Sequence, residues 1–250
     1  IVVNTNTNSI LVQRSLSTST GAIGNSLQRL STGFRINKAA DDAAGLTISE
    51  SLKAQARGSL VASQNAQTGI NLLQTAEGDL GIIQDNLQRI RDLAVQAAND
   101  TNGSSERAAI QSEVKQRLSE IDRLAQGSKF NTIKLLDGTS TSLKLQIGAN
   151  SEASTNAIDV TETSNPLASA STSAGGLDIE LDDMDGSNGT FDTADNAAAY
   201  IDTIDAAIST VSSRRSTIGS IQNRLDSAIQ SLSIKYENMS ASESRIRDVD

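Results

Sequence analysis

The chain of 250 residues contains no cysteine, no histidine and no tryptophan. It has one proline, and its aromatic residues are three Phe and two Tyr. Without Cys and His there is no disulfide, no Ser-His-Asp triad and no histidine-ligated zinc site. A core short of aromatic rings must pack Ala, Leu, Ile and Val, which suits narrow seams between helices. A lone proline permits long helices, because proline is the strongest helix breaker. We therefore predict that the chain is not an enzyme and has no catalytic residues, bound metal or cofactor.

Long apolar runs and evenly spread basic residues are also missing. No run of about 18 apolar residues occurs, and residues 1–30 lack the basic start and apolar centre of a secretory signal peptide. No Lys or Arg lies between Lys144 and Arg214, whereas twelve Asp and Glu residues do. Such an acidic segment repels nucleic acid and favours water. The sequence thus predicts no membrane insertion and no nucleic-acid partner.

The first 34 residues are rich in Ser, Thr and Asn and carry a sparse apolar stripe. Its members, at helical spacings of seven, four and three, are Leu16, Ile23, Leu27 and Leu30. A disordered tail is one interpretation. The stripe favours another, a helix that forms mainly against a partner.

Beyond residue 42 the pattern is that of long helices. Residues 43–99 predict one helix, whose second half repeats apolar residues at alternating spacings of three and four, as in a coiled coil. These are Leu73, Ala76, Leu80, Ile83, Leu87, Ile90, Ala94 and Ala97. A second helix is expected at about 105–124 and a last one at about 194–240. Only Arg215 and Gln222 interrupt the apolar seam of the last helix, and polar seam residues often fix register.

Between these helices the period changes to two. Alternation at Leu143, Leu145 and Ile147, with a turn signal at Asp137-Gly138, predicts a β-hairpin within 130–148. A further strand is possible at 177–181. The fold class is therefore mainly α: a long antiparallel coiled-coil or helical-bundle rod with a small β-hairpin region at one end.

Four parts follow along the chain. They are an inner helix and linker at 1–42, rod helices and hairpin at 43–148, a short acidic surface segment at 149–193, and a rod helix at 194–250. The acidic loop at 178–192 has a weak likeness to a calcium loop. Counted from Asp183, however, the sixth and twelfth positions hold Asn188 and Ala194 instead of Gly and Glu. We interpret it as a solvated loop and leave metal binding open.

The stretch "RINKAADDAAG" at 35–45 holds Asp41, the first acidic residue of the chain, beside Asp42. A carboxylate pair invites a catalytic interpretation, but no catalytic partner is present. Aspartate is a preferred helix N-cap, and the positive end of the helix dipole favours it. We predict that Asp41 and Asp42 start the long helix, with Arg35 or Lys38 near enough to pair with one of them.

Several long stretches resemble bacterial flagellins. They are "VNTNTNSI" (3–10), "LQRLSTGFRINKAADDAAGLTIS" (27–49), "NAQTGINLLQTAEGDLGIIQDNLQRIRDLAVQAAND" (65–100), "IQSEVKQRLSEIDRLAQGSKFNTIKLLDG" (110–138) and "AISTVSSRRSTIGSIQNRLDSAIQSL…SASESRIRDVD" (207–250). The resemblance implies an extracellular subunit that self-assembles into the helical tube of the flagellar filament for motility. The terminal helices would line the tube, and the linker from Arg35 to Lys38 would pack against neighbouring subunits. Contacts that do not close on themselves generate such filaments.

The resemblance also implies partners. The chain would be exported unfolded by the flagellar export apparatus. In the family another helix follows "RIRDVD", and a cytoplasmic chaperone would bind it; a chain ending at Asp250 would polymerise abnormally. An animal Toll-like receptor would contact the convex helical face, and motif matching carries this onto Arg89, Leu93 and Glu113.

Two alternatives remain at this stage. A hook-filament junction protein shares the leader and the long helices, although "LQRIRDLAVQAAND" favours flagellin. A coiled-coil signalling rod, such as the cytoplasmic part of a chemoreceptor, predicts a membrane span or a receptor hairpin tip, and the sequence shows neither.

Overall fold

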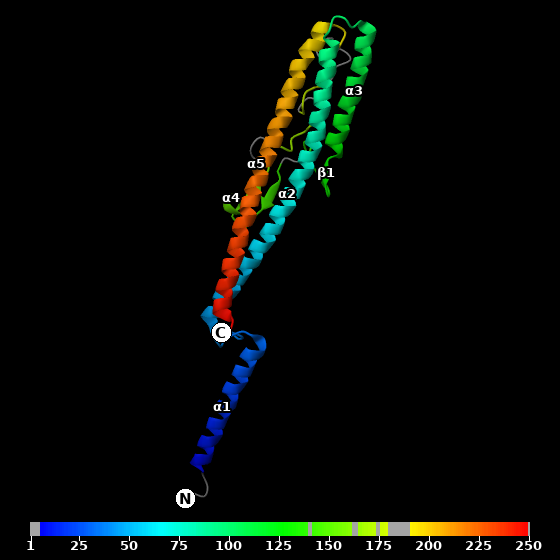
Figure 1. Ribbon diagram of the computed structural model, residues 1–250. Coiled ribbons are helices and arrows are strands. Elements are labelled where there is room, and N and C mark those ends of the chain that lie inside the picture. The colour runs from blue at the N-terminus through cyan, green and yellow to red at the C-terminus, as the bar shows by residue number, and fades with distance from the viewer. Residues whose placement is uncertain (1–5, 140–141, 162–164, 174–175, 180–190, 250) are drawn as a thin grey trace. The chain divides into compact units, whose positions relative to one another are not determined.

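The computed structural model describes residues 6–139, 142–161, 165–173, 176–179 and 191–249 (Figure 1). Within these ranges the chain is mainly helical, as predicted. The elements are α1 (Thr7–Thr32), α2 (Ala43–Ala97), α3 (Ser104–Gly127), β1 (Lys129–Phe130), β2 (Ile133–Lys134), β3 (Lys144–Gln146), α4 (Ala153–Asn156), β4 (Ala157–Asp159) and α5 (Ala194–Arg247). None of the described helices is both long and apolar enough to cross a membrane.

The chain divides into two compact units. The first, called here the joint unit, comprises residues 1–61 and 232–250, and the second, the core unit, comprises residues 62–231. Both long helices contribute to each unit. The division therefore differs from the four parts predicted along the sequence, although α2 and α5 begin at the predicted positions, 43 and 194.

The core unit is built on the predicted seam of α2. All eight of its seam residues, from Leu73 to Ala97, are 0% exposed. Polar contacts join α2 to α5 with residue numbers rising along one helix as they fall along the other: Glu77 with Gln222, Gln84 with Arg215, and Arg91 with Asp205. The two helices are therefore antiparallel. Both polar residues that interrupt the α5 seam, Arg215 and Gln222, bond to side chains of α2, which explains their place in the pattern.

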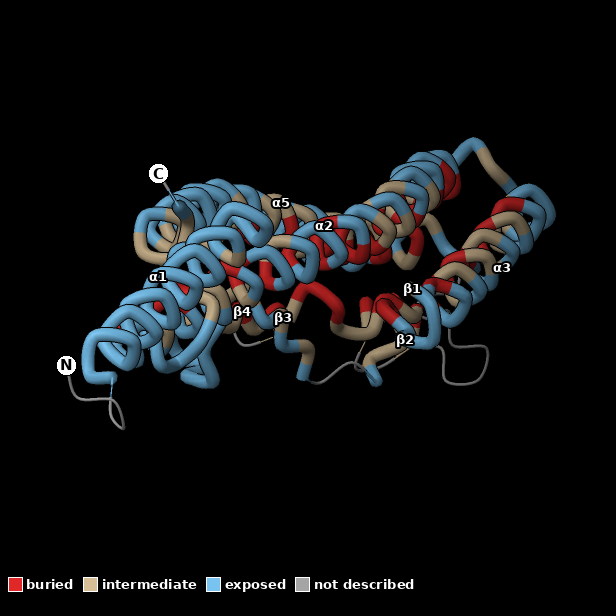
Figure 2. The backbone as a smooth tube through the Cα atoms, turned by 90° about the horizontal axis from the view of Figure 1, so that it is seen from below, coloured by how far each residue is buried: buried red, intermediate tan, exposed pale blue. Residues whose placement is uncertain are grey.

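Helix α3 packs on α2 in the same antiparallel manner. The apolar face predicted for it is buried, and cross-helix contacts line its edge: Arg89 with Glu113, Asn86 with Arg117, and Asp79 with Ser128. Figure 2 shows the buried positions of α2 recurring along the stretch that these helices cover. The α2–α3 connection uses Arg107, whose guanidinium donates to the carbonyls of Ala97 and Asn99 at the end of α2.

The predicted hairpin across 130–148 is wrong in its pairing. β1 pairs with β2 through a turn at Asn131, whose φ is 56°, a left-handed conformation that Asn tolerates. β3 instead pairs antiparallel with β4, more than ten residues downstream. The alternating stretch at 143–147 was therefore correctly seen as extended, but its partner lies in the middle segment.

The segment at 149–193, predicted to be a surface segment, contributes side chains to the core. Val160, Leu167, Ala170 and Phe191 join the hydrophobic core of the core unit. Thr172 bonds to Asp122 of α3 through its backbone N–H at 2.7 Å and its hydroxyl at 2.9 Å.

The possible strand at 177–181 is not formed within 177–179, where the chain instead hydrogen-bonds backbone to backbone with 171–172. Leu181 and most of the acidic loop, including Asn188, lie outside the described residues. The prediction about calcium therefore rests on the sequence alone.

Candidate functional site

The start of α2 is organised by Asp42. Its carboxylate Oδ1 accepts a hydrogen bond from the backbone N–H of Gly45 at 2.9 Å, and Leu46 N–H donates to the Asp42 carbonyl. This is N-cap geometry, which satisfies an otherwise unpaired amide of the first turn. A Cβ at Gly45 would lie within 3 Å of side-chain atoms of Asp42 and of the buried Ile36, so a larger residue there would displace the capping carboxylate or Ile36.

Asp41 holds the linker rather than the helix. Its Oδ2 accepts backbone N–H bonds from Asn37 at 3.0 Å and Lys38 at 2.9 Å. These bonds, first that from Lys38 and then that from Asn37, keep the pKa of this exposed carboxyl below its usual value. The two aspartates thus divide the work: one folds the linker into a turn and the other starts the helix.

Arg35 does not pair with either aspartate among the described residues. Its guanidinium Nη2 donates to the carbonyls of Arg245 at 2.9 Å and Ile246 at 2.6 Å, in the last turn of α5. Its backbone N–H donates to the Arg247 carbonyl. The last carbonyls of a helix lack intrahelical donors, and a cation there is favoured by the helix dipole. Arg35 is therefore a C-terminal cap supplied from a distant segment.

The residue that sequence reasoning missed is Arg247. Its guanidinium lies 2.8 Å from a Glu50 oxygen, 3.7 Å from a Glu243 oxygen and 4.6 Å from the Phe34 ring centroid. Only 17% of its side chain is exposed. A β-bridge between Phe34 and Asp248 fixes the backbone beside it. The contacts with Glu50 and Phe34 join segments some 200 residues apart, and no local sequence pattern predicts them.

Helix α1 has no buried residue (Figure 2). Asn6 caps its start through Ser9 N–H, and Gly33, with φ of 73°, ends it. Its large apolar side chains are all more than half exposed: Ile10, Leu11, Val12, Leu16, Ile23, Leu27 and Leu30. An apolar surface of this extent marks an interaction site.

The three residues matched to receptor contact separate into two groups. Arg89 and Glu113 lie on neighbouring helices with a guanidinium–carboxylate distance of 3.3 Å, and both are partly exposed. Arg117 shares the same Glu113 oxygen at 3.2 Å. Leu93 is 2% exposed, so its side chain packs in the core and does not face solvent.

Nothing in the described ranges gathers three or more carboxylates into a metal site. Tyr200, which donates to the Ile179 carbonyl at 2.6 Å, has its pKa raised by burial, which suits a core hydrogen bond. The features that stand out are thus surfaces and joints, typical of a protein that acts by assembly.

Comparison with known sequences identifies the assembly. Residues 3–141 match the bacterial flagellin N-terminal helical region, and residues 201–250 match the C-terminal helical region. The chain belongs to the bacterial flagellin family. Flagellins form the extracellular flagellar filament, so this chain is a structural subunit of that filament.

Similar flagellins cover the chain almost completely. That of Halalkalibacterium halodurans is 42% identical over 100% of this chain and 86% of its own length. That of Bacillus subtilis is 40% identical over 99% of this chain and 87% of its own. The crystal structure of Bacillus cereus flagellin has 29% identity and a TM-score of 0.53, over 72% of this chain and 94% of that one.

A flagellar hook-associated fold is also similar. The structure of a putative flagellar hook-associated protein from Vibrio parahaemolyticus gives a TM-score of 0.63 over 83% of this chain and 100% of that one. At 15% identity this likeness concerns the fold alone. The flagellin matches therefore favour a filament subunit over a junction protein or a signalling rod.

Proposed function

We propose that α1 is the segment through which this flagellin packs against other copies in the filament. The observation that carries the proposal is the apolar stripe of α1, which has no partner in the described part of its own chain. Burying such side chains against another helix contributes roughly 1.5–3 kcal/mol each. A helix with several of them therefore gains much from a neighbouring subunit.

The joint unit fits this proposal. The linker carrying Arg35 is hydrogen-bonded to the last turn of α5, and the ion pair between Arg247 and Glu50 joins that end of α5 to α2. We infer that this fixes where α1 leaves the folded chain, and that the same linker packs against neighbouring subunits.

Polar substitution within the stripe tests the assembly role. Ile23→Ser with Leu27→Ser should abolish filaments seen by electron microscopy, while unfolding of the monomer is unchanged because both side chains are exposed. Asn25→Ser with Ser26→Ala, on exposed polar positions between them, is the matched control. Normal filaments from the apolar-to-polar variant would overturn the proposal.

We further propose that the soluble subunit is a ligand of the animal Toll-like receptor for flagellin, through the exposed Arg89–Glu113 pair. The proposal rests on the family resemblance and is supported by their exposure on adjacent helices. Arginine at a protein interface often contributes most when desolvated by the partner. Leu93 would hold α2 in position beneath this pair.

Receptor activation by purified monomer provides the test. Arg89→Ala should reduce activation at least tenfold, whereas Arg123→Ala, an exposed arginine paired with Glu120 on α3, should leave it unchanged. Equal activity of both variants would remove Arg89 from the receptor surface.

Export through the flagellar apparatus, aided by a cytoplasmic chaperone, completes the proposal. The absence of cysteine supports it, since no disulfide can hold the chain folded during passage. Fusion to a tightly folded domain should block secretion, and a destabilised version of that domain should restore it. Secretion of both fusions would contradict unfolded export.

A further inference from the structure

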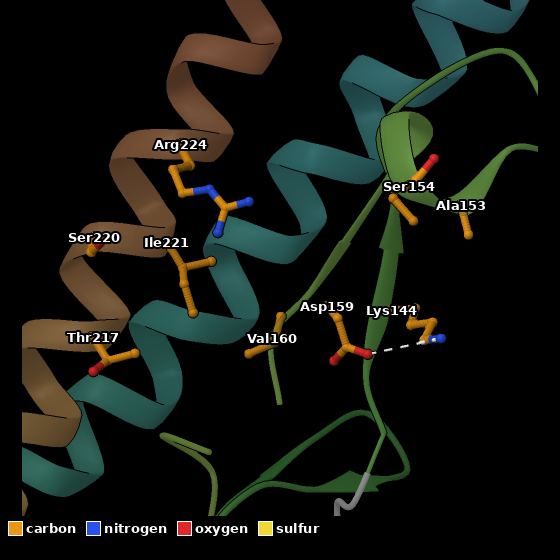
Figure 3. Close-up of a pocket in the computed structure, with 10 residues that line it drawn as sticks. Lys144, Ala153, Ser154, Asp159, Val160, Thr217, Ser220, Ile221 and Arg224 are labelled. Atoms are coloured by element: carbon orange, nitrogen blue, oxygen red, sulfur yellow. Dashed lines mark ion pairs between the residues drawn. The ribbon is translucent and has the colours of Figure 1, made fainter. Parts of the chain in front are cut away.

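A groove lies in the core unit between α5 and the segment that contains α4 and the β3–β4 pair (Figure 3). It consists of two adjoining cavities of about 570 Å³ and 700 Å³, which share Ser154, Ala157, Ser220 and Arg224. We call it the Arg224 groove. Hydroxyl groups of Thr217, Ser220 and Ser154 line it beside apolar side chains such as Ile221 and Ile158, so its walls offer both hydrogen bonds and apolar contacts.

The groove carries an excess of positive charge. Lys144 lies across from Asp159 at 3.9 Å, so these two charges offset each other. Arg224 is exposed and extends from α5 toward the strands in Figure 3, and its side chain has no ion pair or hydrogen bond with any residue in the described ranges. Its guanidinium presents five N–H donors in a fork that matches a carboxylate.

Carboxylates without partners occur at the start of the same helix. Asp195 and Asp202 are exposed and lie seven residues apart on one face of α5, and their carboxylates have no hydrogen bond or ion pair within the described ranges. No Lys or Arg occurs between 145 and 213 to neutralise them from nearby in sequence. The start of α5 therefore presents a negative surface that complements the groove.

We propose that the Arg224 groove binds the acidic start of α5, at Asp195 and Asp202, of a second copy of this chain. Asp195 and Arg224 are 29 residues apart on one α-helix, or about 44 Å at 1.5 Å per residue. One chain cannot make this contact with itself. A neighbour displaced along the helix axis by about that length can.

The proposed contact joins two different surfaces of the subunit, and this determines whether copies form a closed dimer or a filament. A two-fold dimer through the groove would bring Arg224 against Arg224, which like charges disfavour. A groove-to-start contact is head-to-tail, and a head-to-tail contact that does not close continues as a filament. The inference rests on this chain being a filament subunit and names one contact within that filament.

Charge reversal and charge exchange test the pairing. In full-length subunits under polymerising conditions, Arg224→Glu should raise the critical concentration roughly tenfold, and Asp195→Lys with Asp202→Lys should act similarly. The triple variant, in which the charges of all three residues are reversed, should have a critical concentration close to that of the unaltered subunit. Lys129→Glu, an exposed lysine outside the groove, is the control for net charge and should change the critical concentration less than twofold.

Cross-linking gives an independent readout because the chain has no cysteine of its own. Ser220→Cys with Ala198→Cys places thiols too far apart for a bond within one chain, so oxidised filaments should yield a ladder of disulfide-linked copies. Ser220→Cys with Ala108→Cys should not. A triple variant no better than the single-end variants, or no ladder from the first pair, would overturn the contact. Failure of the unaltered subunit to polymerise would instead contradict the filament function.

Discussion

Helix α1 and the second half of α2 carry apolar residues at similar helical spacing, yet they end in opposite environments. Every seam residue of α2 from Leu73 to Ala97 is 0% exposed, whereas Leu30 of α1 is 76% exposed. The two helices differ in whether the partner that buries their apolar face lies in the same chain. α2 finds α3 and α5 in its own chain, and α1 finds no cover among the described residues. Apolar periodicity therefore predicts a buried face without saying which molecule buries it.

The largest effect that sharpens this comparison is truncation in the seam. Leu87→Ala should destabilise the monomer by about 3 kcal/mol, because it removes a fully buried side chain and leaves a cavity. Leu30→Ala should change monomer stability by less than about 0.5 kcal/mol, as surface substitutions do. Denaturant unfolding of both variants checks this. Equal losses would show that α1 is already packed in the monomer.

A smaller effect is expected at the junction between the two helices. Asp42→Ala should cost about 1 kcal/mol through loss of the N-cap bond to Gly45, whereas Asp42→Asn, which keeps an acceptor, should cost little. Combined with Asp41→Ala, it should fray the start of α2 and lower the temperature at which filaments dissociate. Thermal melts of monomer and filament measure both. Filaments of the double variant that match the unaltered ones would show that neither aspartate shapes the junction.

The sequence was informative wherever contacts are local or periodic. Spacing alone predicted the α2 seam, and residue type predicted the cap at Asp42. Contacts across long sequence separation were not predictable. Arg35 was expected near Asp41 because the two are close in sequence, but it bonds instead to α5 carbonyls more than 200 residues away. The strand at 144–146 likewise pairs with 157–159. Backbone N–H and C=O groups are the same in every residue, so the sequence does not specify which strand is the partner. Leu93 was matched by motif, and a motif does not say which side of a helix faces the core.

A further effect, confined to acid pH, concerns the turn after β2. Burial tends to raise the pKa of Asp137, but hydrogen bonds from Thr139 and the Lys134 ammonium, 2.9 Å away, outweigh it and lower the pKa to about 2. Since its unfolded value is 3.8, the stability it contributes is fully present above about pH 4 and is lost as pH falls toward 2. Asp137→Asn should flatten monomer stability over that interval, and α1 should not respond. An unchanged pH dependence in urea titrations would contradict this role.

The most direct test of the account is amide hydrogen exchange of α1 measured in monomer and in filament. Residues 83–90 of α2 should be protected in both states, because their partners lie in the same chain. Residues 10–30 should exchange rapidly in the monomer and at least a hundredfold more slowly in the filament. Strong protection of α1 in the monomer, or rapid exchange that persists in the filament, would contradict the claim that other copies bury its stripe.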